Sequence, residues 1–276
     1  MISRSFAIAT LCTLLGLPGP LAAQEPVNTE IPPGLPEILR DALMTDAAES
    51  GHWAYTETNQ AEASVGKPQG ETIVRFDPSK PYADQYTALK INGQEPTEKQ
   101  REGYRRRGEN RGRKLEPAVS QNGASIAPPV NVGGQKFNLD FTRAAVVTED
   151  ATSVTYQLPM KNNGKKDFPV DKFQFLIRVN RERRVLERVA VKLKEAFRVK
   201  VIAKFNAMEF RMDYTTVDPQ FPPQLTSVSG AFAAKMLLMN VNVKTVTMRT
   251  DFQRVKPFNE RPGVKALPVT LLEFLQ

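Results

Sequence analysis

The residues most able to carry chemistry in this chain are basic ones, and they are concentrated in one segment. Between Glu98 and Lys114 the sequence has eight basic and three acidic residues. Such a cluster can attract anionic lipid headgroups or an acidic protein partner, or it can serve as a solvated helix face. The candidate basic surface consists of Lys99, Arg101, Arg105, Arg106, Arg107, Arg111 and Arg113. Tyr104 is the one aromatic residue interleaved with it, so we expect no nucleic-acid partner.

Catalytic and metal-binding residues are sparse. His52 is the only histidine, so a cluster of histidine ligands is excluded, and a nucleophile–histidine pair would depend on this one residue. Carboxylates such as Asp167 and Asp171 show only ordinary spacing. There is no glycine-rich phosphate loop. We therefore expect a non-enzymatic protein with no catalytic residue, no metal and no cofactor.

The first 23 residues have the pattern of a secretory signal peptide. Arg4 provides a positive start, an apolar run extends from Phe6 to Leu17, and Ala23 ends a small-residue cleavage site. An uncleaved membrane anchor is the alternative, but it needs a longer apolar run. Cleavage removes Cys12, the only cysteine, so the mature chain would contain no disulfide. The expected location is the periplasm.

The elements that must position these residues lie mainly between Lys172 and Phe252. In this stretch apolar side chains recur at every second position, as they do from Phe173 to Val179, while the alternate positions are polar. This period predicts antiparallel strands with one dry face. The expected fold class is α+β, mainly β: a curved antiparallel sheet that forms an open half-barrel covered by helices.

Two changes of phase predict corners in this sheet. The run from Phe197 to Tyr214 is too long for one straight strand, and its apolar phase changes near Ala207. A second change follows Val243, where Val246 and Met248 take the other phase. We expect a bulge at each place, because bulges bend sheets into barrels.

Helices and further strands precede the sheet. An amphipathic pattern predicts a helix over 36–49, after an extended lead-in over 24–35. Strands are expected at 52–59 and 71–76, and a third between the turns Asp77-Pro78 and Asn92-Gly93. Thr97 is expected to cap a helix that carries the basic residues.

The rest of the predicted domain, residues 36–276, contains one irregular part. Gly, Asn, Ser and Pro residues predict a mobile loop from Arg111 to Gly134, within a basic and polar insertion at about 108–135. Strands are expected at 144–147 and 153–160, followed by a turn at 162–164. A terminal strand or short cover is expected within 267–275.

The dry face of the sheet is the candidate site for an apolar ligand. It could also be filled by the protein itself, or buried against a second sheet. Five of the eight methionines lie in this region, and flexible thioethers suit either a variable apolar ligand or an ordinary core. The candidate lipid-binding residues are Trp53, Phe175, Val199, Val201, Phe205, Phe210, Met212, Leu237, Met239 and Val241.

The order of these elements resembles bacterial envelope proteins of the LolA-like superfamily, which includes lipoprotein carriers and RseB-like stress sensors. The likeness rests on the segments Phe76 to Pro81 and Leu89 to Thr97, followed by a helix and a long meander. These segments are more similar to a branch of uncharacterised members than to the carriers. The resemblance implies that the concave face binds a lipid or lipoprotein acyl chain. The alternative is an envelope sensor or interaction module with a self-filled sheet and a basic helix that docks a partner.

Overall fold

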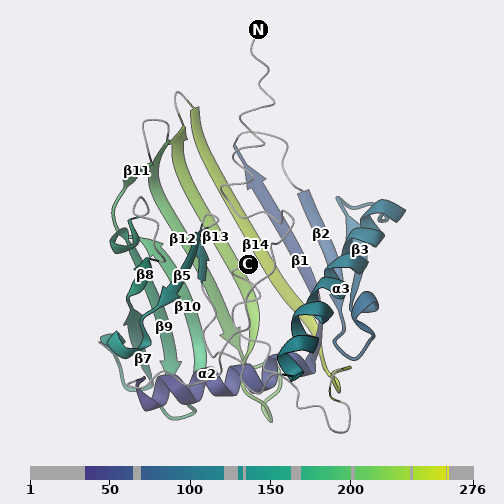
Figure 1. Ribbon diagram of the computed structural model, residues 1–276, viewed down its shortest axis with the longest axis horizontal. Helices are drawn as coiled ribbons and strands as arrows, with labels where there is room; N and C mark the ends of the chain where they lie inside the picture. Colours follow the sequence, from purple (N-terminus) through teal and green to yellow (C-terminus); the bar gives the residue numbers. More distant parts are fainter. Residues whose placement is uncertain are drawn as a thin grey trace.

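The computed structural model describes residues 35–64, 70–120, 130–132, 135–162, 169–199, 203–236, 239–258 and 260. The protein is mainly β, as the alternating pattern predicts, with two α-helices among the described residues (Figure 1). The helices are α2 (Glu37–Glu49) and α3 (Glu98–Ser120), and short 3-10 turns are η1 (Ser50–His52), η2 (Tyr82–Asp84), η3 (Phe141–Arg143) and η4 (Val170–Lys172). None of the described helices combines the length and apolar character needed to cross a membrane.

The main sheet has eleven antiparallel strands. They are β1 (Trp53–Ala63), β2 (Gly70–Phe76), β3 (Tyr86–Ile91), β6 (Ala145–Glu149), β7 (Ser153–Leu158), β9 (Phe173–Asn180), β10 (Val185–Leu193), β11 (Phe197–Val199), β12 (Ala203–Thr215), β13 (Gln224–Met236) and β14 (Met239–Arg254). Their order is β3-β2-β1-β14-β13-β12-β10-β9-β7-β6, with β11 beside β12. A small second sheet contains β4 (Val130–Val132), β5 (Gln135–Leu139) and β8 (Met160–Asn162).

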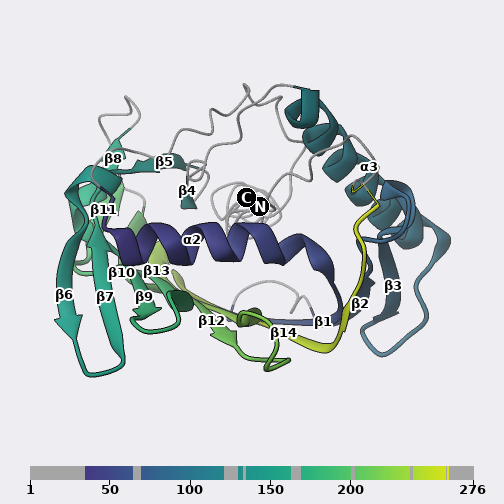
Figure 2. The same ribbon diagram turned by 90° about the horizontal axis from the view of Figure 1, so that it is seen from below.

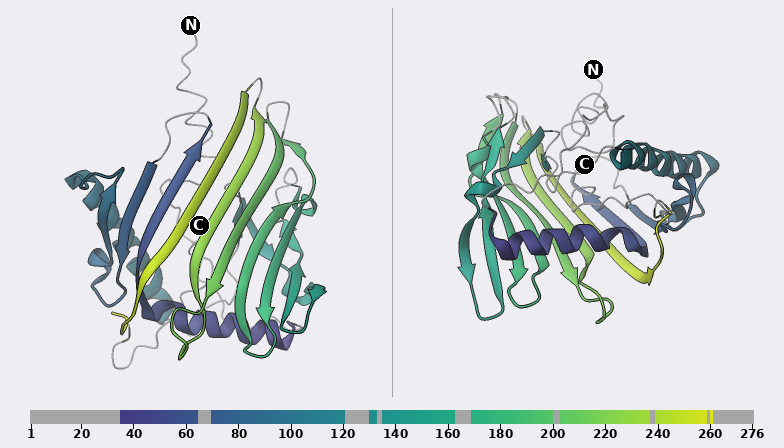
Figure 3. Two further views of the ribbon diagram at one scale, coloured as in Figure 1. Left: turned by 180° about the vertical axis from the view of Figure 1, so that it is seen from behind. Right: turned by 60° about the horizontal axis from the view of Figure 1, so that its bottom comes forward.

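The main sheet is curved and open. Figure 2 shows its curvature in a view along the strands, and Figure 3 shows from behind that β14 lies between β1 and β13. Strand β14 therefore joins the N-terminal strands to the central meander. The sheet does not close into a barrel, because β3 and β6 stay at opposite ends of the strand order.

The inner, concave face of the sheet carries the predicted dry phase. In β9 the alternate residues Phe173, Phe175, Ile177 and Val179 are buried, whereas the residues between them are half-exposed. The period of two is therefore confirmed where it is clearest.

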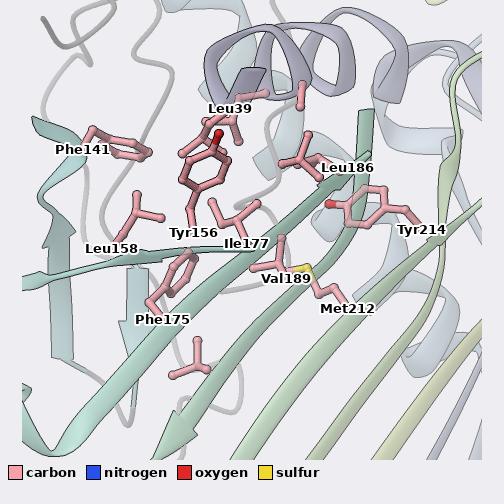
Figure 4. Packing of buried hydrophobic residues seen from close by; sticks show 14 of the residues in the cluster. Leu39, Phe141, Tyr156, Leu158, Phe175, Ile177, Leu186, Val189, Met212 and Tyr214 are labelled. Carbon is pink, nitrogen blue, oxygen red and sulfur yellow. The ribbon is translucent and has the colours of Figure 1, made fainter. Parts of the chain in front are cut away.

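Helix α2 runs across one end of the sheet, which we call the α2 end; the opposite end, where β13 turns into β14, is the far end (Figure 1). The buried side chains Leu39, Ala42 and Leu43 of α2 belong to the same apolar cluster as residues of β7, β9 and β10. Figure 4 shows Leu39 above Tyr156 and Ile177 in this cluster. The helix predicted over 36–49 is confirmed.

Helix α3 packs against η2 and the edge strand β3. Its N-terminus is capped as predicted: the Gln100 amide N–H donates to Thr97 Oγ1 at 3.4 Å, and the Gln100 side chain accepts from the Thr97 amide at 2.8 Å. The helices thus lie at one end and one edge of the sheet, and a cover over the whole inner face is not confirmed.

The loop predicted from Arg111 is wrong over its first part, because α3 continues to Ser120. Gly108 and Gly112, two of the glycines in this helix, allow it to approach η2 closely. A Cβ at Gly108 would lie 1.8 Å from the Tyr82 carbonyl oxygen, and one at Gly112 would lie 2.5 Å from the Tyr82 ring. The remainder of the predicted loop holds β4, while residues 121–129 and 133–134 lie outside the described residues.

The corner predicted near Ala207 is confirmed, since the pairing of β12 with β13 shifts register between Phe205 and Ala207. The chain also reverses before this point, because β11 pairs antiparallel with the start of β12. The long run from Phe197 is therefore two strands rather than one bent strand.

The second predicted corner is wrong in position. β13 and β14 pair without interruption from Ser227 to Met236, so no bulge follows Val243. Val246 and Met248 lie on the outer face and are exposed, and the inner positions of this part of β14 hold Thr245 and Thr247. The irregularity comes later, at Asp251, whose φ of 52° accompanies a register shift against β1.

Strand β13 was not predicted, because its sequence is dominated by small residues. One of them has a clear function in packing. Gly230 lies opposite Phe210 and Thr245, and a Cβ there would come within 2.7 Å of the Thr245 hydroxyl and 3.7 Å of the Phe210 ring. The small residue thus leaves space for the neighbouring Thr245 side chain, while the Phe210 ring lies at ordinary contact distance. Of the turn predicted at 162–164 only Asn162, at the end of β8, is described, and the signal segment 1–23 and the terminal segment 267–275 lie outside the described residues.

Candidate ligand-binding face

The inner face near α2 is filled by the protein's own side chains. Phe175 and Met212, two candidate lipid-binding residues, are 1% and 0% exposed and belong to the cluster that contains Leu39. Figure 4 shows Met212 beneath Val189, within the apolar layer between sheet and helix. These two residues therefore belong to the core of the protein, not to an accessible ligand surface.

Toward the far end, the apolar side chains of the inner face are less buried. There the apolar side chains Phe205, Met208, Phe210, Met236 and Val243 are only half-buried, and we call these five residues the far-end apolar surface. Phe205, Met208, Met236 and Val243 pack around the buried residues Phe232, Ala234 and Val241, whereas Phe210 packs against the cluster that contains Leu39. Aromatic contacts order this region: the Phe197 and Phe205 rings are stacked with centroids 4.8 Å apart, and Phe232 meets Phe205 edge-on at 5.4 Å.

The other predicted lipid-binding residues are divided between several places. Trp53 is buried at the α2 end, where its ring contacts Phe221 and Phe252 edge-on. Met239 is 45% exposed at the far end. Val199 lies in β11, but its side chain is not described, and Val201 and Leu237 lie outside the described residues.

A buried ion pair crosses the inner face between β1 and β14. Arg249 donates from Nε and Nη2 to Glu57 Oε2, at 3.3 and 3.2 Å, and both side chains are 8% exposed. Asn59 donates to the other Glu57 oxygen at 3.2 Å and accepts a hydrogen bond from Thr247 at 2.6 Å. Burial is the largest single influence and raises the pKa of Glu57, but the charges of Arg249 and Arg107 and the hydrogen bonds from Asn59 and Arg249 together outweigh it, so the pKa of Glu57 is lowered.

This ion pair continues into a series of aromatic rings and arginines. Arg249 lies over the Tyr55 ring at 3.9 Å, Tyr55 contacts Phe76 at 5.1 Å, and Phe76 contacts Tyr86 at 4.9 Å. From α3, Arg107 lies 4.3 Å over Tyr86 and Arg111 lies 5.2 Å over Phe76. Cation–π contacts therefore connect α3 to the inner face of β1, β2 and β3.

Asp46 brings a second carboxylate to the same region, from α2. Burial raises the pKa of Asp46 to about 7, although the positive charge of Arg249 opposes this shift. The pKa of buried Tyr214 is also raised, first by burial and then by the neighbouring Asp46. Within the described part of the chain, no hydrogen bond or ion pair to the Asp46 carboxylate is found.

The predicted basic surface is only partly a surface. Arg111 is buried and donates to Gln85 Oε1 at 2.8 Å, and Arg107 is held over Tyr86. Arg106 and Arg105 pair with Glu102 and Glu109 one helical turn away. The exposed members are Lys99, Arg101, Arg105, Arg106, Arg107 and Arg113. The helix thus uses two of the predicted binding arginines, Arg107 and Arg111, for its own attachment.

Sequence reasoning missed Glu57, Arg249 and Asp46. The alternation of β1 could have indicated Glu57, because this residue has the same phase as Trp53 and Tyr55 and must face the same side of the sheet. Arg249 was missed because the apolar residues just before it, Val246 and Met248, follow the opposite phase and lie on the outer face.

Among the described residues, no three His, Cys, Asp or Glu side chains gather in a way that could hold a metal ion. The comparisons add no family: no protein-family model, curated protein or solved structure matches this chain.

Proposed function

We propose that the protein is a non-enzymatic envelope protein that binds the acyl chain of a lipid or lipoprotein on the far-end apolar surface. The observation that carries the proposal is the contrast between the two ends of the inner face. Near α2 the apolar side chains are sealed by Leu39 and Leu43, whereas at the far end aromatic and thioether side chains remain half-exposed. Half-exposed apolar side chains on a concave face gain free energy when an apolar chain covers them.

The chemistry of this surface suits a flexible apolar ligand. Met208 and Met236 have adaptable thioether side chains, and Phe205 and Phe210 provide flat apolar area. In this proposal α2 and α3 border the half-barrel and limit where the ligand lies. The envelope location is part of the same proposal and depends on the predicted signal segment 1–23.

The decisive experiment measures binding of a fluorescent fatty-acid probe, together with native mass spectrometry of protein purified from cells. Phe205→Asp should weaken probe binding about tenfold or more, because a carboxylate in an apolar contact must be desolvated. Met239→Asp tests the same end at an already exposed position. The matched control is Val246→Asp, a similarly exposed outer-face site on the same strand as Met239, which should leave binding unchanged.

A clean apo mass combined with no probe binding by the folded wild-type protein would exclude the proposal. Equal loss of binding in Val246→Asp would place the probe elsewhere. Circular dichroism of each variant separates lost binding from lost folding.

A second candidate function has its own support, because α2 already fills one end of the inner face. In that case the protein is an envelope sensor or interaction module, and α3 docks an envelope protein or an anionic membrane through its exposed cations. Arg105→Glu with Arg106→Glu should then abolish co-sedimentation with anionic vesicles or capture of a partner. Arg111 is unsuitable for this test because its guanidinium is buried and donates a hydrogen bond to the Gln85 side chain.

A further inference from the structure

Strand β6 is the least protected strand of the main sheet. It is the last strand in the order, and among the described strands it pairs with β7 alone. All five of its residues are exposed, and Val146 and Val147 are 52% and 43% exposed. Figure 2 shows β6 at the outer rim of the sheet, whereas the opposite edge strand β3 is accompanied by α3.

The backbone of β6 offers hydrogen bonds that β7 does not use. An edge strand presents a row of outward N–H and C=O groups, which can pair with another extended strand. The β6–β7 register shifts between Val146 and Thr148, so Val147 is an extra residue in the ladder. The partner that fits such an edge is a β-strand, and the exposed valines add apolar contact to its hydrogen bonds.

We propose that this partner is β6 of a second copy of the chain, paired antiparallel about a two-fold axis at Val147. This is the one centre that pairs all five residues. It places Val147 against itself, Val146 against Thr148, and Ala145 against Glu149 of the second copy. No like charges face each other in this register, which is a requirement for stable cross-strand pairs.

Charge also favours this arrangement. Arg143 is exposed just before the strand and forms no ion pair with another described residue. The two-fold register brings it toward Glu149 of the second copy, which in the single chain pairs with Arg181. A two-fold axis repeats each of these contacts, so the interface is self-complementary.

The pairing joins the two sheets through one short strand from each copy, so the buried interface area is small and the dimer is weak. The fraction of dimer therefore rises with protein concentration. Sedimentation velocity over a series of protein concentrations should show a monomer–dimer equilibrium. Val147→Lys should raise the dissociation constant about tenfold or more, because two ammonium groups then face each other on the axis. The matched control Val246→Lys alters an exposed valine on central strand β14 and should leave the equilibrium unchanged.

Cysteine cross-linking tests the register independently of affinity. In a Cys12→Ser background, Val147→Cys should form a disulfide-linked dimer under mild oxidation, because the two sulfurs would face each other across the axis. Glu149→Cys should not, since it lies opposite Ala145. A monomeric wild-type protein at its highest soluble concentration would overturn the proposal, and so would cross-linking that is as efficient at position 149 as at position 147.

Discussion

The guanidinium of Arg249 lies 3.9 Å above the ring of Tyr55 while it donates two hydrogen bonds to Glu57. One side chain thus satisfies a buried carboxylate and covers a buried aromatic ring. The arrangement places a charged pair on a largely apolar inner face, where the loss of either charge should measurably change the stability of the protein.

Arg249→Met should destabilise the protein by about 3–5 kcal/mol, because it leaves Glu57 buried without its partner charge. Glu57→Gln in addition should recover much of this loss, since a neutral amide needs less compensation. Urea denaturation of both single variants and the double variant measures the coupling. Additive losses would mean that the two residues do not act as a pair.

Asp46 should make the stability depend on pH in the neutral range. Its pKa is raised in the folded protein from 3.8 to about 7, so the folded state holds the proton more tightly than the unfolded state. This contribution to stability is present at low pH and is lost as the pH rises toward and through 7. Asp46→Asn removes the titration and should therefore become more stable than wild type above pH 7.

At about 1.4 kcal/mol for each pKa unit, the advantage of Asp46→Asn at pH 8 over pH 4 has an upper limit of about 4 kcal/mol. Thermal melting of the two proteins across this range gives the difference directly. Other carboxylates titrate equally in both proteins, so they cancel. A difference that does not change with pH would contradict the raised pKa.

Gly108→Ala should destabilise the attachment of α3, although alanine favours helix by about 1 kcal/mol over glycine. The added Cβ would lie 1.8 Å from the Tyr82 carbonyl oxygen, so η2 and the helix must separate. Gly103→Ala is the matched control, because nothing lies within 4 Å of its Cβ and the same helix should become more stable. Hydrogen exchange of α3 amides reports both effects.

Thr97→Ala should lower the free energy of unfolding by about 1 kcal/mol, because the Gln100 amide N–H loses its side-chain acceptor at the start of α3. The change should appear as faster hydrogen exchange in the first turn of α3. Thr97→Ser retains the hydroxyl and should preserve protection. Equal exchange in the alanine and serine variants would show that the cap contributes nothing.

Much of the fold could be predicted from local patterns. The strand β9 alternates strictly, and Thr97 is a typical cap. Asn92 and Gly93 form the expected turn, with φ of 53° and 74°. Each of these features depends on residues that are close together in the sequence, so the sequence pattern alone is enough to predict it.

The candidate site was less predictable, because it depends on which strands become neighbours. Glu57 and Arg249 are 192 residues apart and meet only because β14 inserts between β1 and β13. Gly112 lies in the segment predicted as a loop, yet its missing side chain permits close packing of α3 against the Tyr82 ring. In both cases the residue type fits several environments, and distant packing selects one.

The sequence by itself determined that this protein is mainly β, with a dry sheet face and a capped basic helix, because period and capping are local properties of the chain. Only the tertiary structure decided how that face is used. Helix α2 covers the apolar side chains at one end, an ion pair crosses the middle, and Phe205 and Phe210 stay half-exposed at the other end. The physical reason is that burial depends on the elements that pack against a side chain, and strand order sets those contacts.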